Sequence, residues 1–262
     1  MVNKQERHRL IVESLDGGSR LDVGDVSHEL GVSEMTIRRD LKELEAAGLL
    51  RRVHGGAVRQ LGRAYEPPHS LRSQESTGPK AAIGRATALL VEPGDAIAVD
   101  TGTTCQEAVR ALQRAKRSQM TVVTASLRVA GEIASTFVLD QDLRLIVVGG
   151  TVRPGELSMV GATARAVIRT MHVDKALIGV GGIDIHRGCT EFNVEDSEVK
   201  RQFIESAKQV IVLADSTKLG QVAFASVCGI DAVDVLVTDS AIHPNQVAAF
   251  EAAGVRVVIA ED

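Results

Sequence analysis

The sequence contains no tryptophan, and aromatic residues make up only 2% of its 262 residues. Proteins that bind single-stranded nucleic acid without sequence preference stack the bases on aromatic side chains. Sequence-specific RNA-binding proteins use similar stacking surfaces. The composition therefore disfavours both a single-strand binder and an RNA-binding adaptor.

Cysteines are also few, and long apolar runs are absent. Cys105, Cys189 and Cys228 are far apart in the sequence and form no CxxC pair, and the seven histidines lack the spacing of metal ligands. This disfavours a zinc site or a disulfide framework, and we expect no metal and no other cofactor.

Apolar runs such as LIVVGG at 145–150 are too short for a membrane span. With no secretory signal at the N-terminus, we expect a cytoplasmic protein that does not bind membranes.

An overall excess of positive charge is absent as well, since the formal net charge is −4. The first sixty residues hold ten basic and ten acidic residues, so the whole deficit lies in residues 61–262. Within 35–59, however, there are six basic residues and three acidic ones. Local charge matters more than the total for attracting phosphates. Residues 35–59 therefore remain a candidate for contacting nucleic acid.

The first sixty residues have the pattern of a small helical domain. Apolar residues recur at helical spacing over 3–15, and 23–30 fits a second, short helix. Gly31 directly follows the expected helix 23–30, at the position where the end of a helix favours a residue in the left-handed conformation. A longer helix is expected after it. This succession is the helix-turn-helix pattern. The residues around Gly55 and Gly56 fit the β-hairpin of a wing.

The longer helix is expected to turn its polar side outward. Ile37, Leu41 and Leu44 recur at i, i+4 and i+7, which predicts that they face the core, and Gly48 is expected to end the helix. The N-terminal part of such a helix reaches base edges, and a wing can contact the flanking backbone. The residues that we expect at DNA are Ser33, Met35, Thr36, Arg38, Arg39, Lys42, Arg52 and His54. The alternative is a small helical domain with a solvated basic surface.

The stretch VSHELGVSEMTIRRDLKELEAAGLLRRVHGGAV, at 26–58, closely resembles the DNA-binding region of the DeoR family of bacterial transcriptional regulators. TIRRDL, the LE..G.L.R continuation and HGGA occur in that family's order and spacing. The resemblance implies a winged helix-turn-helix domain. The residues that it places on the recognition helix are Ser33, Thr36, Arg38 and Arg39. It also implies that Asp40 is a structural partner within the fold and not a base reader.

Residues 59–79 show no apolar periodicity and are rich in proline, glycine and serine, which is typical of a linker. We expect a DNA-binding domain over 1–58, a linker over 59–74 and an effector-sensing domain over 75–262. In the last of these, apolar β-branched runs alternate with helical stretches, which predicts an α/β fold with a mainly parallel sheet. The expected strands are 96–100, 120–126, 143–150, 175–182, 209–215, 234–239 and 255–260.

The turn DTGTTC, at 100–105, joins an expected strand to an expected helix. Backbone N–H groups and threonine hydroxyls at the positive end of a helix suit a phosphate, although an ordinary N-cap in a tight turn is an equal alternative. The absence of a GxxxxGK spacing disfavours a nucleotide triphosphatase, and GVGGID at 179–184 lacks the last glycine of a dinucleotide fingerprint. Lys218 could neutralise an anion or be an ordinary surface lysine.

The motifs DTGTT, VVTAS, VVGG, DKALIGVGGID and ADSTKLG occur in the order seen in DeoR-family effector domains, whose fold is similar to ribose-5-phosphate isomerase. The resemblance implies that Gly102, Thr103 and Thr104 hold a phosphate. The residues that it places nearby are Asp100, Ser126 and Lys218. Ala125 stands where the family often has asparagine, which leaves the effector's identity open. Cys105 is expected to be a packed small residue, and a lowered thiol pKa with a redox role is the less favoured alternative.

We therefore expect a DNA-binding transcriptional regulator and not an enzyme. It would repress a sugar or carbohydrate operon and leave its double-stranded operator DNA when a phosphorylated sugar or related metabolite binds. Such proteins usually bind paired half-sites, so we expect a homodimer or homotetramer. The alternative is a sugar-phosphate isomerase with a DNA-binding appendage, whose general base Glu191, Glu195 or Glu198 would supply. The appended domain and the lack of an aligned base favour the regulator.

Overall fold

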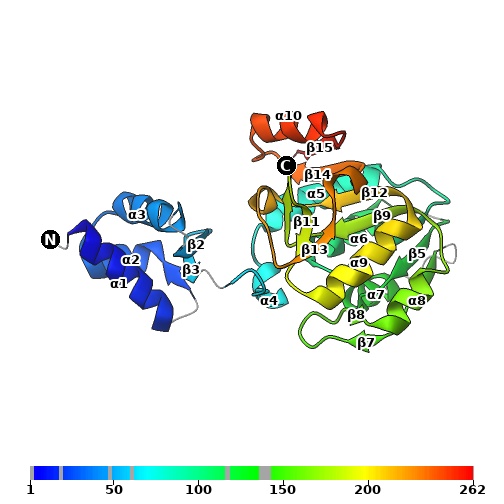
Figure 1. Cartoon of the computed structure of the whole chain (residues 1–262), viewed down its shortest axis with the longest axis horizontal. Coiled ribbons are helices and arrows are strands. Elements are labelled where there is room, and N and C mark those ends of the chain that lie inside the picture. The colour runs from blue at the N-terminus through cyan, green and yellow to red at the C-terminus, as the bar shows by residue number, and fades with distance from the viewer. Residues whose placement is uncertain are drawn as a thin grey trace. The chain divides into compact units, whose positions relative to one another are not determined.

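The structure is a computed structural model that describes residues 3–17, 20–46, 49–59, 62–115, 119–135 and 143–261. The chain divides into two compact units, Met1–Tyr65 and Glu66–Asp262, which are drawn in Figure 1. No described helix has both the length and the apolar character that a membrane span requires. Each unit has a hydrophobic core of its own.

The amino-terminal unit contains three helices and a small antiparallel sheet (Figure 1). The helices are α1 (Lys4–Gly17), α2 (Val23–Leu30) and α3 (Glu34–Ala46). The strands, which pair in the order β1-β3-β2, are β1 (Leu21–Asp22), β2 (Leu50–Val53) and β3 (Gly56–Arg59). The expected helix-turn-helix and wing are therefore confirmed, and the wing has one more short strand than expected.

Local signals explain where the helices of this unit begin and end. The side chain of Asp22 caps α2 by accepting hydrogen bonds from the N–H groups of Gly24 and Asp25. Gly31 ends α2 in the left-handed conformation, with φ of 62°. Ser33 Oγ accepts a hydrogen bond from Thr36 N at 3.2 Å at the start of α3. Gly48, the expected end of that helix, lies outside the described residues.

The second unit is built on a parallel sheet of seven strands in the order β15-β14-β12-β9-β4-β5-β6. Every strand expected from the apolar runs is present in it. The strands are β4 (Ala96–Val99), β5 (Thr121–Thr124), β6 (Arg144–Val147), β9 (Val173–Gly179), β12 (Ala207–Leu213), β14 (Val235–Asp239) and β15 (Arg256–Ala260). Side chains alternate between two cores: Leu177 joins one, and Ala176 and Ile178 join the other.

Helices cover both faces of the parallel sheet, which explains why its strands are apolar on both sides. The helices whose buried residues join one core are α5 (Thr77–Leu89), α6 (Thr103–Arg114) and α7 (Leu127–Ala134). Those that join the other core are α8 (Ala162–Ile168), α9 (Val194–Ser206) and α10 (Pro244–Ala252). Figure 1 shows α9, in yellow, lying across one face of the sheet.

Several short elements beside the parallel sheet were not predicted. A three-stranded antiparallel sheet has the order β10-β11-β13, and β7 pairs with β8. These strands are β7 (Thr151–Val152), β8 (Met159–Val160), β10 (Gly182–Asp184), β11 (Gly188–Glu191) and β13 (Ala225–Cys228). Two 3₁₀ turns are η1 (Ser216–Lys218) and η2 (Ile230–Ala232). The expected strand 175–182 is in fact divided between β9 and β10.

The start of the second unit differs from the expected linker 59–74. A short helix, α4 (His69–Arg72), lies within that range. Arg72 donates hydrogen bonds to Glu66 at 3.2 Å and to Glu156, and Arg153 donates to Glu66 at 2.9 Å. These ion pairs attach residues 66–74 to the second unit, although their sequence has no helical or strand periodicity.

Candidate functional site

In the amino-terminal unit, the polar side of α3 is exposed to solvent. Met35 keeps 74% of its surface exposed, while Ile37 and Leu41 are at 0% and 1%. The basic residues on this side are Arg38, Arg39 and Lys42, and all three are exposed. The inward and outward positions of α3 therefore agree with the helical spacing.

Three of the expected DNA contacts in and beside α3 already have local partners. Arg38 forms an ion pair with Glu34 one turn earlier, at 2.7 Å. Both side chains are more than half exposed, so the pair is worth little, about 0.3–0.5 kcal/mol, and a phosphate or base could replace Glu34. The hydroxyls of Ser33 and Thr36 lie 2.9 Å apart in a hydrogen bond.

The wing adds two exposed residues at its tip, Arg52 and His54. The backbone N–H of Arg52 donates to Glu45 at 2.7 Å, which ties strand β2 to helix α3. The carbonyl oxygen of His54 accepts from Arg20 at 2.8 Å. Arg20 is a further basic group at the wing that sequence reasoning missed, because 34 residues separate the two partners.

Beneath α3, Asp40 is confirmed as a structural partner. It is fully buried and accepts hydrogen bonds from Arg7 Nε and Nη2, the latter at 3.0 Å, and from His8 Nε2 at 3.1 Å. Burial by itself raises the pKa of Asp40, but the hydrogen bonds from Arg7 and His8 outweigh it and hold that pKa below its usual value. Both partners belong to α1, and no sequence spacing pointed to them.

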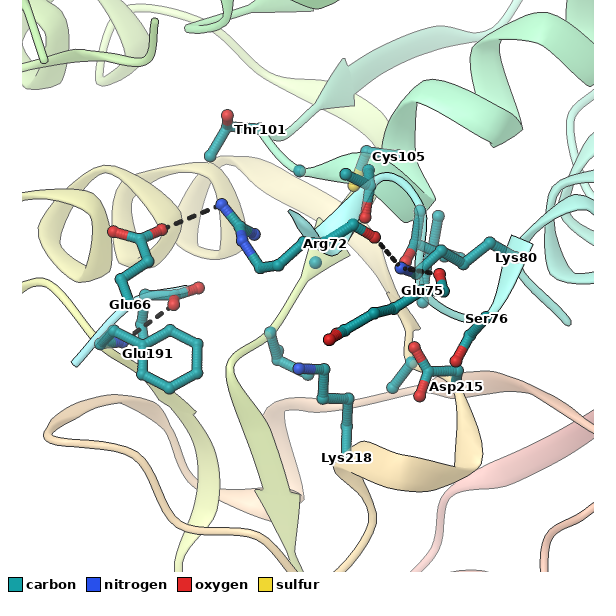
Figure 2. A pocket seen from close by; sticks show the side chains of 18 of the residues that line it. Glu66, Arg72, Glu75, Ser76, Lys80, Thr101, Cys105, Glu191, Asp215 and Lys218 are labelled. Atoms are coloured by element: carbon teal, nitrogen blue, oxygen red, sulfur yellow. Dashed lines mark hydrogen bonds and ion pairs between the residues drawn. The ribbon is translucent and has the colours of Figure 1, made fainter. Parts of the chain in front are cut away.

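In the second unit, a pocket opens where β4, β9 and β12 end, and Figure 2 shows part of its lining. The carboxyl ends of parallel strands are where α/β folds bind ligands. Four of the expected effector residues line it: Gly102, Thr103, Thr104 and Lys218. Asp100 and Ser126 do not. Asp100 is buried in an ion pair with Lys200, and Ser126 is buried where its Oγ caps α7 by accepting from Val129 N at 3.3 Å.

The first turn of α6 faces this pocket with open hydrogen-bond donors. Gly102 precedes the helix with φ of 117°, and no side chain caps it. The first N–H of the turn with an intrahelical acceptor is that of Gln106, bonded to Gly102 O at 3.1 Å. The preceding helical N–H groups, of residues 103–105, therefore have no acceptor within the helix. Within the described part of the chain, the buried hydroxyl of Thr101 also has no hydrogen-bond partner.

Cationic groups surround the same hollow. Figure 2 shows Arg72, Lys80 and Lys218 around it, with Glu66 bonded to Arg72. Lys80 Nζ donates to the carbonyl oxygens of Arg72 at 2.5 Å and Glu75 at 2.7 Å, and burial lowers the pKa of Lys80. Sequence reasoning missed both Arg72 and Lys80, since they lie in or next to the expected linker.

A buried ion-paired group closes the inner wall of the pocket. Lys200, only 1% exposed, pairs with Asp100 and with Glu191 at 3.2 Å, and it donates to Gly179 O at 3.0 Å. Burial lowers the pKa of Lys200, but the two carboxylates outweigh it and raise that pKa above its usual value. Glu191 is therefore already bound to a buried cation.

The other two glutamates considered as a general base lie elsewhere. Glu198 forms an ion pair with Arg165 at 3.2 Å. Glu195 is exposed in the first turn of α9 and is not part of the pocket lining. Of the three candidates, only Glu191 reaches the pocket.

Cys105 is a packed residue, and the alternative of a lowered thiol pKa is wrong. Its side chain is completely buried, and burial raises the pKa of the thiol well above its usual value. Its Sγ donates to Leu177 O at 3.8 Å. A Cβ on Gly179 would lie 3.1 Å from Thr101 O and 3.3 Å from Cys105 Sγ. This glycine of GVGGID thus allows close packing of β9 against the 101–105 turn.

Comparison with known proteins covers nearly the whole chain. The models described as "DeoR-like helix-turn-helix domain" and "DeoR C terminal sensor domain" match residues 7–60 and 75–240. The HTH-type transcriptional regulator GlpR of Haloferax volcanii is 33% identical over 254 residues, covering 97% of this chain and 96% of that protein. The glycerol-3-phosphate regulon repressor of Escherichia coli is 30% identical over 239 residues, covering 91% and 92%.

Among solved structures, ribose 5-phosphate isomerase A from Methanocaldococcus jannaschii aligns with 53% of this chain and 53% of its own, at 16% identity and a TM-score of 0.39. A likeness of this extent carries no inference about activity. The matches to the two domain models and to full-length regulators are much more extensive. They agree with the winged helix-turn-helix domain and the separate α/β sensor unit. The chain belongs to the DeoR family of DNA-binding transcriptional regulators.

Proposed function

We propose that this regulator is a repressor of a sugar or carbohydrate operon, released from its operator when a phosphorylated sugar or related metabolite occupies the sensor pocket. The observation that carries the proposal is the uncapped first turn of α6, which faces a pocket with Lys80 and Lys218 in its lining. Backbone N–H groups at a helix N-terminus bind phosphate well, and two nearby ammonium groups strengthen the attraction.

The rest of the pocket suits a polyol better than a nucleotide. Carboxylates of Glu75 and Asp215 in the lining can accept hydrogen bonds from sugar hydroxyls. Phe192 is the one aromatic residue in the described lining, which leaves little surface for stacking a base. The orphan hydroxyl of Thr101 offers one more donor or acceptor at the same turn. These features support a small phosphorylated polyol as the effector class.

On the DNA side, we infer that α3 lies in the major groove and that the wing contacts the flanking backbone. The residues that we assign to this surface are Ser33, Met35, Thr36, Arg38, Arg39, Lys42, Arg52 and His54. The residues of α3 are supported by their position on the side opposite its packed residues, and Arg52 and His54 by their exposure on the wing. We further propose a homodimer or homotetramer that acts in the cytoplasm, because paired half-sites require two such helices.

We also infer that the α/β unit senses its ligand and does not convert it. An isomerase needs a carboxylate free to remove a proton from carbon. Glu191 reaches the pocket but is held in an ion pair with the buried ammonium of Lys200 at 3.2 Å, so it is not such a free carboxylate. The related proteins named above are a transcriptional regulator and a regulon repressor, which fits this inference.

The test is a titration of DNA from upstream of the protein's own gene with the full chain, in which fluorescence anisotropy measures binding. A shuffled duplex of equal length is the control. A panel of sugar phosphates, the corresponding free sugars and inorganic phosphate is then added. We expect specific binding that one phosphorylated sugar reverses and its free sugar does not. Release by free sugars, or turnover of a sugar phosphate, would contradict the proposal.

A further inference from the structure

Two cysteines lie opposite each other on neighbouring strands of the small antiparallel sheet. Cys189 of β11 and Cys228 of β13 are partners in the strand register. Both side chains pack against the same core. Directly opposed residues of antiparallel strands have Cα atoms about 4.5–5.5 Å apart, and disulfides join Cα atoms about 4.4–6.8 Å apart. The pair therefore has the spacing that a disulfide needs.

The strands approach each other closely beside this pair. A Cβ placed on Gly188, the residue before Cys189, would lie only 2.1 Å from the carbonyl oxygen of Cys228. The register also shifts between Cys189 and Thr190, and such irregularities increase the local twist of a strand. Side chains of directly opposed residues lie on the same face of an antiparallel pair. The thiols of Cys189 and Cys228 are therefore neighbours in the reduced protein.

The environments of the two thiols differ in a way that suits stepwise oxidation. Cys189 is completely buried, whereas Cys228 is partly exposed. The neighbouring thiol of Cys189 lowers the pKa of Cys228, whereas the neighbouring thiol of Cys228, together with burial, raises the pKa of Cys189. A reagent in solution therefore meets Cys228 first, and this thiol is also the more readily ionised of the pair.

We propose that Cys189 and Cys228 form a reversible dithiol–disulfide site whose oxidant is a small-molecule disulfide. The Cys228 thiolate attacks one sulfur of that disulfide, forms a mixed disulfide and expels one thiolate. Cys189 then loses its proton and attacks Cys228 Sγ, which forms the protein disulfide and expels the second thiolate. Overall, two protein thiols are oxidised and one disulfide is reduced to two thiols.

The bond would join β11 to β13 two residues from Glu191, which ends β11 and lines the sensor pocket. Cys105 provides an internal control, since it is fully buried and bonded to Leu177 O. Neither the site nor its test depends on which effector the pocket binds.

The experiment incubates the full native chain with glutathione disulfide, blocks the remaining thiols, and measures intact mass and linked peptides. We expect the wild type to lose two of its three thiols, to gain a Cys189–Cys228 link and to recover all three after dithiothreitol. Cys189→Ser should stop at a glutathione adduct on Cys228, and Cys228→Ser should keep its thiols. Cys105→Ala should behave as the wild type does.

Three results would overturn the proposal. The wild type could keep all its thiols under conditions that oxidise a small dithiol control. It could retain glutathione on Cys228 without forming the protein disulfide. It could also form links through Cys105 or between chains in place of the pair. Because each result is read on the wild type, the test does not depend on the stability of any variant.

Discussion

Replacing Asp40 by asparagine tests how the recognition helix is held in place. In the wild type the fully buried carboxylate accepts hydrogen bonds from Arg7 and His8 of α1. Asp40→Asn leaves Arg7, only 7% exposed, without its counter-ion. Removing one partner of a buried pair costs about 3–5 kcal/mol, and asparagine keeps one acceptor oxygen, so we expect the lower end of that range. A loss of this size is a large fraction of the stability of a small domain.

The loss should also depend on pH, with a sign that follows from the pKa of Asp40. Because Arg7 and His8 hold that pKa below its usual value, the ionised carboxylate stabilises the folded unit above about pH 4. The stabilisation disappears as the pH falls through the lowered pKa, where Asp40 becomes protonated and resembles asparagine. The free energy of unfolding should therefore differ most between the wild type and Asp40→Asn at pH 7, and this difference should disappear under acid conditions.

The assay is urea unfolding of the full chain, monitored by a probe attached to the amino-terminal unit. It is carried out at pH 7 and at a series of pH values below 4. Glu43→Gln is the matched control, since Glu43 joins the same two helices through an exposed ion pair with Lys4 at 2.6 Å. Exposed pairs are worth less than about 1 kcal/mol, so the control should change little. A difference for Asp40→Asn that does not shrink in acid, or an equal loss in Glu43→Gln, would refute the reasoning.

Three further predictions concern the two binding surfaces, and anisotropy titration with operator and shuffled DNA measures all of them. Arg38→Ala should weaken operator binding by about 1–3 kcal/mol if the side chain contacts a base, whereas an equal loss on shuffled DNA would mean that it contacts only the backbone. Lys218→Ala should keep operator affinity and lose the response to the effector; loss of operator binding would contradict the separate roles of the two units. Gly102→Ala should also lose the response, because φ of 117° is strained for alanine by about 1–3 kcal/mol; an unchanged response would remove the α6 turn from the site.

The sequence predicted the large elements well because their signals are local and repeated. The inner strands of the parallel sheet are largely buried on both faces and read as apolar runs, and α3 shows its packed side at helical spacing. The small antiparallel sheet has neither signal, since β10 and β11 are short and rich in glycine and polar residues. In addition, β11 pairs with β13, which begins 34 residues after β11 ends.

The candidate pocket was predicted in part for a similar reason. The 102–104 turn could be recognised because a strand, a glycine and a helix follow one another directly. Lys80 and Arg72 reach the pocket from α5 and α4, and only the tertiary fold brings them there. Asp100 and Ser126 follow the ends of their strands as expected, but their side chains turn into the protein, toward Lys200 and the first turn of α7.

Lys200 is the residue that holds the inner wall of the candidate pocket together. Its ammonium group joins the turn after β4 through Asp100, the end of β9 through Gly179 and the end of β11 through Glu191. Three segments of the pocket wall therefore share one buried cation. These contacts fix the shape of the wall and keep Glu191 in an ion pair. Loss of Lys200 would leave two buried carboxylates without a counter-ion, so the wall of the candidate pocket depends on this one buried cation.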